Sequence, residues 1–142
     1  MITVVFYEKP GCVTNARQKM LLRAAGLYVT ERDLLREPWT LTRLRRFFGE
    51  RPVREWFNPV APRVQSGEVL PHRLSAEEAL LLMVEDPLLI RRPLIEVGGQ
   101  RFAGFDPAVL GESLGGEWPT ARLLQGCSTH ADKPCVLPES AA

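Results

Sequence analysis

The sequence has few cysteines and no paired redox motif. Three of its 142 residues are cysteines, an odd number, and two of them, Cys127 and Cys135, stand near the C-terminal end. This pattern excludes the disulfide framework of a small secreted protein. Asn15 stands where the second cysteine of a CxxC motif would follow Cys12, which excludes dithiol exchange within that turn. Thiol chemistry at Cys12 therefore has to be monothiol chemistry.

The sequence also lacks a long apolar run and an excess of charge of either sign. No apolar stretch approaches the ~20 residues that a membrane-spanning helix needs. The net charge of +1 gives no electrostatic footprint for nucleic acid or a membrane surface. The chain opens as a strand, without the basic region and apolar core of a signal peptide. We expect a cytoplasmic globular protein that binds neither nucleic acid nor membranes.

The order of the predicted elements indicates an α/β fold. Strands are predicted over residues 2–7, 27–33, 93–97 and 100–103. Helices are predicted over residues 15–25, 40–48, 75–84 and 108–114. The short crossover between the first two strands favours a parallel pair, and Gly98-Gly99 favours an antiparallel hairpin. The expected fold is a four-stranded mixed sheet, in the order β-α-β, helical insert, β-β-α, with helices on both faces.

One domain is expected over residues 1–115, with the helical insert at 38–86 and a poorly ordered tail over 116–142. Ser75 and Glu78 match a capping box at the start of a helix. A loop is expected from Pro59 to Arg73. In the insert, a cluster of aromatic residues predicts a core, and a run of arginines predicts a solvated face. The aromatic residues are Trp39, Phe47, Phe48, Trp56 and Phe57.

Cys12 stands on the turn between the first predicted strand and the first predicted helix, within FYEKPGCVTNAR. Unpaired N–H groups and the helix dipole favour an anion such as a thiolate at this position. The alternative is a small buried hydrophobic residue. We expect an exposed, functional thiol, with Thr14 or Asn15 capping a helix that buries its apolar positions. Those positions are Ala16, Met20, Leu21 and Ala24.

Arg92 directly precedes Pro93, the residue that opens the third predicted strand. Neighbouring residues of an extended chain point to opposite sides, so one of Arg91 and Arg92 can face the Cys12 turn. We expect that residue to be Arg92; the alternative is a surface ion pair with Asp86. A proline at a strand start is compatible with a cis or a trans bond.

The segments YEKPGC, LLIRRPLIEV and GGQRFAGFDP resemble the arsenate reductase family of glutaredoxin-like proteins, which also includes the Spx-type transcription regulators. Longer segments, YEKPGCVTNARQKMLL, RDLLREPWT, FFGERPVREWFN, DPLLIRRPLIEVGG and AGFDP, resemble its nitrogenase-associated branch, whose members are encoded beside nitrogen-fixation genes. The resemblance covers residues 2–115. It implies a thioredoxin-like fold with a helical insert, and it favours a cis bond before Pro93.

For the site, the resemblance implies Cys12 as the nucleophile and Arg92 as an oxyanion-binding residue. The two other oxyanion arginines of the family fall on Asn58 and Gly104, and a histidine that favours the thiolate falls on Glu8. A site with one arginine in place of three binds an oxyanion more weakly unless another cation takes part. The sequence offers Lys9, Arg54, Arg91 and Arg101.

Two functions stay open from the sequence. The first is a monothiol oxidoreductase in which Cys12 attacks an oxyanion or a mixed disulfide, Arg92 orients it, and glutathione is the reductant, with no bound cofactor. The second is a binding module that contacts a protein of the nitrogen-fixation system and reduces arsenate weakly or not at all. No metal site is predicted, because the tail residues are too few for a closed zinc site. They are Cys127, His130 and Cys135, with Asp132 as a poor fourth ligand. We expect a flexible tail with incidental cysteines; the alternatives are a resolving thiol that reaches Cys12 and a tail disulfide.

Overall fold

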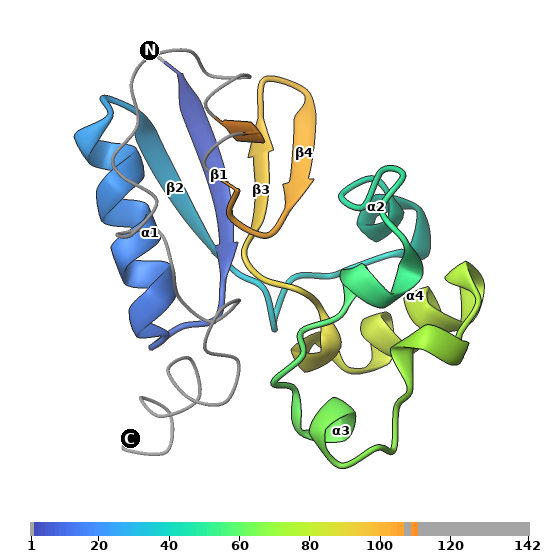
Figure 1. Ribbon diagram of the computed structural model, residues 1–142. Coiled ribbons are helices and arrows are strands. Elements are labelled where there is room, and N and C mark those ends of the chain that lie inside the picture. The colour runs from blue at the N-terminus through green and yellow to red at the C-terminus, as the bar shows by residue number, and fades with distance from the viewer. Residues whose placement is uncertain (1, 107–108, 111–142) are drawn as a thin grey trace.

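The computed structural model describes residues 2–106, 109 and 110, which form a four-stranded sheet of order β2-β1-β3-β4 (Figure 1). The strands are β1 (Thr3–Glu8), β2 (Tyr28–Asp33), β3 (Leu94–Val97) and β4 (Gln100–Ala103). β1 pairs in parallel with β2, while the β1–β3 and β3–β4 pairs are antiparallel. The predicted mixed sheet is therefore confirmed, with its parallel first pair and its hairpin.

The central strand β1 contributes to two separate cores, because its side chains alternate between the faces of the sheet. Val4 and Phe6 pack in a cluster with Leu22 of α1 (Val13–Ala24). Tyr7 packs on the opposite face with residues of the insert. Figure 1 shows α1 on one side of the sheet and the helices of the insert gathered beyond the other.

The insert between β2 and β3 consists of short helices. They are α2 (Leu41–Arg45), η1 (Val53–Trp56), α3 (Pro62–Gln65), η2 (Pro71–Arg73), α4 (Ala76–Glu85) and η3 (Pro87–Leu89), where η marks a 3₁₀-helix. The capping box at Ser75 and Glu78 is confirmed, with hydrogen bonds of 2.9 and 3.1 Å. The helix predicted to end near Phe48 ends at Arg45. The loop expected from Pro59 contains α3, because Pro62 occupies the first helical turn, where proline is favoured.

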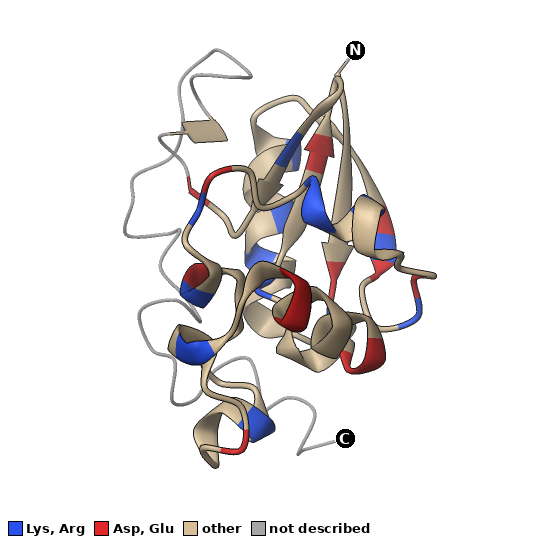
Figure 2. Ribbon diagram, turned by 90° about the vertical axis from the view of Figure 1, so that its right-hand side faces the viewer, with Lys and Arg blue, Asp and Glu red and all other residues tan. Residues whose placement is uncertain are grey.

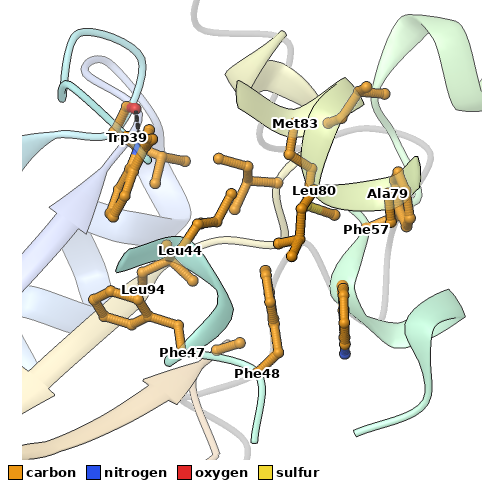
Figure 3. Packing of buried hydrophobic residues seen from close by; sticks show 14 of the residues in the cluster. Trp39, Leu44, Phe47, Phe48, Phe57, Ala79, Leu80, Met83 and Leu94 are labelled. Atoms are coloured by element: carbon orange, nitrogen blue, oxygen red, sulfur yellow. Dashed lines mark hydrogen bonds between the residues drawn. The ribbon is translucent and has the colours of Figure 1, made fainter. Parts of the chain in front are cut away.

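The aromatic residues of the insert form its core, as predicted (Figure 3). Phe48 and Trp56 stack with their ring centroids 4.7 Å apart. Trp39 contacts Phe47 edge-on at 5.6 Å, and its indole Nε1 donates to the carbonyl of Leu34 at 2.9 Å. Leu94, the first residue of β3, belongs to the same cluster. This core therefore packs the insert against the sheet at the residue that directly follows Arg92 and Pro93.

The first helix buries a different face from the one predicted. α1 begins at Val13 with Cys12 as its N-cap, so Thr14 and Asn15 lie inside the helix. Its buried residues are Thr14, Asn15, Gln18 and Leu22, whereas Met20 is 67% exposed. Asn15 and Gln18 tolerate burial because Asn15 accepts from the Lys9 N–H of the preceding turn and donates to the side-chain oxygen of Gln18.

Basic and acidic residues are interspersed along the described part of the chain (Figure 2). Within the predicted solvated run, Arg45, Arg46 and Arg54 are exposed, but Arg43 lies over the Trp39 ring at 4.6 Å. No described helix is long and apolar enough to cross a membrane. Residues 107–108 and 111–142, with Cys127, His130, Cys135 and most of the predicted last helix, lie outside the described residues.

Candidate functional site

Cys12 occupies the N-terminal end of α1, as the sequence predicts. The turn after β1 contains Gly11, whose φ of 84° is in the region that favours glycine. The Cys12 N–H donates to the Lys9 carbonyl at 3.2 Å, and its own carbonyl accepts from Ala16 at 3.1 Å, which closes the first helical turn. The cysteine is a free thiol, but it is only 3% exposed. The expectation of a solvent-exposed thiol is therefore wrong.

Arg92 faces Cys12. The pKa of Arg92 is lowered by its burial, and a charge interaction and a side-chain hydrogen bond with Cys12 oppose that lowering. The bond between Arg92 and Pro93 is cis, as the resemblance favours. The alternative partner, Asp86, instead pairs with Arg63 at 3.3 Å and accepts from Leu88 N–H. The structure thus brings together the two residues proposed as nucleophile and oxyanion ligand.

Two further basic side chains surround this pair. Lys9 is buried, and its pKa is lowered first by that burial and then by the charge of Arg92. The pKa of Arg91 is lowered by burial and then by Arg51, against weaker opposing effects of Glu55 and Asp106. Burial thus disfavours the charged forms of Lys9, Arg91 and Arg92, and repulsion from one neighbouring arginine adds to this effect for Lys9 and Arg91. Such a cluster attracts an anion, either a thiolate or a ligand.

Glu8, which replaces the histidine of the reductases, does not stand as an isolated negative charge. Lys19 Nζ lies 2.7 Å from Glu8 Oε1 and also contacts Glu31. Burial lowers the pKa of Lys19, but hydrogen bonds to Glu31 and Glu8 outweigh that effect and raise it. Glu8 is therefore neutralised by Lys19 and adds no uncompensated negative charge near Cys12.

A cavity of about 100 Å³ adjoins Arg92. It is lined by Thr14, Asn15, Gln18, Asn58, Pro59, Arg91, Arg92, Gly104 and Phe105. Asn58 and Gly104, where the family has arginines, therefore lie at the same cavity as Arg92. Of the four candidate replacements, Arg91 lines it, whereas Arg54 is exposed and Arg101 pairs with Glu96 at 3.4 Å. Cys12 is not among the lining residues, but it interacts with Arg92, which is.

Thr14, Asn15 and Gln18 of α1 form a polar wall of this cavity, which was not predicted from the sequence. Thr14 and Gln18 are four residues apart, as are Gln18 and Leu22, so they share one helix face. This four-residue spacing is the sequence feature that could have indicated the buried face. The apolar set that contains Met20 was preferred instead, since polar residues are mostly expected on the solvent side of a helix.

Comparisons with known proteins agree with this fold. The model of the ArsC family matches residues 49–112. A Rhodospirillum rubrum protein, named as an uncharacterized 15.7 kDa protein in the draG 3′ region, is 52% identical over 115 residues, or 81% of this chain and 80% of that protein.

Solved structures provide the third comparison. An arsenate reductase from Vibrio cholerae has a TM-score of 0.65 at 24% identity, covering 78% of this chain and 97% of that one. A putative ArsC family related protein from Bacteroides fragilis has a TM-score of 0.68 at 24% identity, covering 79% and 98%. At such identities these likenesses show the thioredoxin-like fold alone. With the family model and the R. rubrum relative, they establish that this chain belongs to the ArsC family.

Proposed function

We propose that this chain is a nitrogen-fixation-associated member of the ArsC family that acts by contact with a protein of that system, and that it reduces arsenate weakly or not at all. The resemblance to the nitrogenase-associated branch supports the association, as does the R. rubrum relative named for the draG 3′ region. The proposed location is the cytoplasm, with no bound cofactor.

The observation that carries the proposal is the state of the thiol and its surroundings. Cys12 is 3% exposed, so a substrate has little access to the sulfur. In addition, Asn58 stands at a position that holds an oxyanion arginine in the reductases. Since arginine forks hold and orient a tetrahedral oxyanion for attack, both features reduce turnover of arsenate.

The Cys12→Ser variant tests this function in two assays. In the source organism, growth on dinitrogen and capture of the partner are expected to match those of the wild type. In vitro, with arsenate, glutathione and glutaredoxin, the wild-type chain is expected to turn over no faster than the variant. Loss of growth on dinitrogen or of the partner in the variant would contradict a role by contact.

A second candidate, a monothiol oxidoreductase, is favoured by the contact between Arg92 and Cys12. In that reaction the Cys12 thiolate attacks one sulfur of a glutathione mixed disulfide, and the other sulfur leaves as a thiolate. A second glutathione thiolate then attacks the Cys12-linked disulfide and releases Cys12. Turnover of a glutathione mixed disulfide by the wild type, abolished in Cys12→Ser and Arg92→Met, would favour this candidate over the first.

A further inference from the structure

The lining of the cavity beside Arg92 includes several hydrogen-bond donors, and no described carboxylate belongs to it. The side-chain oxygen of Asn58 accepts from Val60 N–H at 3.2 Å, and that of Gln18 accepts from Asn15 Nδ2 at 3.0 Å. Each of these amides has therefore engaged its acceptor within the protein and keeps its NH₂ group for a ligand. A lining of this kind fits an anion.

The orientation of the Gln18 amide is fixed by the backbone. Asn15 Oδ1 accepts from the Lys9 N–H at 3.2 Å, so the NH₂ group of Asn15 has to face Gln18. Gln18 must then turn its oxygen toward Asn15 and its NH₂ group away from it. The backbone of the turn before Cys12 thus fixes the orientation of Asn15, and through Asn15 it leaves the NH₂ group of Gln18 as a donor toward the cavity.

Two guanidinium groups complete the lining. In the part of the chain that the structure describes, Nε of Arg91 and Nε of Arg92 are both buried without a hydrogen-bond partner. The Arg91 N–H donates to the Trp56 carbonyl at 2.9 Å, and the Asn58 N–H donates to the Leu89 carbonyl at 2.8 Å. These two bonds hold Arg91 and Asn58 at the same cavity. Buried, unpaired N–H donors are rare in native proteins unless a ligand or water meets them.

Gly104 provides the space for Arg91. Its φ is +85°, and a Cβ at this position would lie 2.6 Å from Arg91 Nε and 3.3 Å from Nη2. Its N–H donates to the Pro93 carbonyl at 2.7 Å, so the backbone has little freedom to withdraw. The Arg91 guanidinium therefore keeps its place only if residue 104 has no side chain.

We propose that Arg91 is the second anion-binding guanidinium of this cavity, in the space that Gly104 leaves open, and that the occupant is a small tetrahedral oxyanion such as phosphate or sulfate. In the reductases that the chain resembles, the corresponding arginine is at the position of Gly104. Here a guanidinium approaches the same backbone position from residue 91. A cavity of about 100 Å³ has room for one such anion, since a water molecule takes about 30 Å³ in the liquid.

Binding of phosphate and of sulfate to the full chain, measured by titration calorimetry, tests the assignment without any thiol chemistry. Arg91→Met is expected to weaken binding by at least about tenfold, the effect of losing one charge-assisted hydrogen bond. The control is Arg36→Met, which removes the same charge from a side chain that is 89% exposed. It is expected to bind both anions as the wild type does.

A pair of glycine variants tests the role of the space itself. Gly99 has the same φ of +85° as Gly104, but an added Cβ there would meet no atom within 4 Å. Gly104→Ala and Gly99→Ala therefore carry comparable backbone strain, and only the first displaces Arg91. Gly104→Ala is expected to bind phosphate and sulfate about as weakly as Arg91→Met does. Gly99→Ala is expected to bind both anions with the affinity of the wild type. The rise in melting temperature on adding phosphate should shrink in Gly104→Ala and Arg91→Met, which a purely structural role of Arg91 would not cause.

Three results would overturn the inference: no binding of either anion to the wild type, equal affinity of Arg91→Met and wild type, or equal affinity of the two glycine variants. If Arg91→Met does not fold, Arg91→Lys keeps the charge but loses the planar fork, and a several-fold loss of affinity is expected. None of these outcomes bears on the nitrogen-fixation role, because the assay measures ligand binding alone.

Discussion

Lys19 neutralises Glu8 at the edge of the candidate site, and Lys19→Met tests how much this contact stabilises the fold. The Lys19 and Glu8 side chains are 12% and 15% exposed, and their charged atoms lie 2.7 Å apart. Removal of the ammonium group leaves the Glu8 carboxylate largely withdrawn from water without its partner. Glu31, which shares Lys19, is 45% exposed and can return to solvent.

The expected loss lies between two known limits. Exposed ion pairs contribute about 0.2–1 kcal/mol, whereas breaking a fully buried pair costs about 3–5 kcal/mol. A mostly buried pair that keeps some water falls near the middle, at about 2 kcal/mol. At about 4 °C per kcal/mol for a chain of this size, the melting temperature should fall by about 8 °C. Thermal unfolding followed by circular dichroism measures this shift.

The stabilisation should also depend on pH in a defined direction. The pKa of Lys19 is raised, so its contribution is present below its unfolded value of about 10.5 and is lost as the pH rises through the folded value. The pKa of Glu31 is lowered, first by its hydrogen bond with Lys19, so its contribution is present above about 4.5 and is lost on acidification. The difference between wild type and Lys19→Met should therefore be largest between about pH 5 and pH 10.

Arg23→Met is the matched control, because Arg23 reaches Glu31 at 3.9 Å from a side chain that is 49% exposed. It is expected to cost less than about 0.5 kcal/mol. A double-mutant cycle with Glu8→Gln isolates the pair, and a coupling energy of about 1 kcal/mol or more is expected. A melting temperature of Lys19→Met within about 2 °C of wild type, or a coupling energy of zero, would refute the reasoning.

Three further predictions follow from burial and capping. Cys12 should react with iodoacetamide at least about tenfold more slowly in the native chain than in guanidinium, as read by mass-resolved peptide mapping; equal rates would contradict its burial. Ser75→Ala should cost about 1 kcal/mol in chemical denaturation through loss of the capping bond to Glu78, and no change would show that the bond adds nothing. Phe47→Ala should cost about 3–5 kcal/mol, since Phe47 is 2% exposed; a loss no larger than that of Leu81→Ala, whose side chain is 54% exposed, would argue against this core.

The sheet and the capping of α4 were predictable because their signals are local. β-branched and aromatic residues over 2–7, the Gly98-Gly99 turn and the Ser75–Glu78 box each specify structure within a few residues. The buried face of α1 was not predictable in this way. Its burial depends on Asn15 meeting the Lys9 N–H six residues earlier in the chain, and on Gln18 completing that network. Hydrophobic periodicity contains no information about such satisfied polar groups.

The exposure of Cys12, like the buried face of α1, depends on contacts that a local sequence pattern does not contain. The sequence places the thiol at a helix N-terminus, which depends on the local turn and is confirmed. Whether solvent reaches the sulfur depends instead on distant residues. Arg92, eighty positions along the chain, lies against it. Local reasoning therefore gives the position of the residue in the fold, while its accessibility is a property of the packed molecule.

Arg91 and Arg92 do not follow the alternation of side chains that was expected for an extended chain. Alternation along a strand predicts that Arg91 and Arg92 point to opposite sides, yet both line the same cavity. The rule does not apply, because β3 begins at Leu94 and the chain bends at Arg92. If Arg91 pointed away from Arg92, Gly104 would be only the loss of an oxyanion arginine. Because Arg91 lines the cavity as well, the missing Cβ at residue 104 is what leaves space for a second guanidinium beside Arg92. Gly104 and Arg91 therefore have to be interpreted together, and the affinities of Gly104→Ala and Gly99→Ala measure whether the glycine is needed for the anion site.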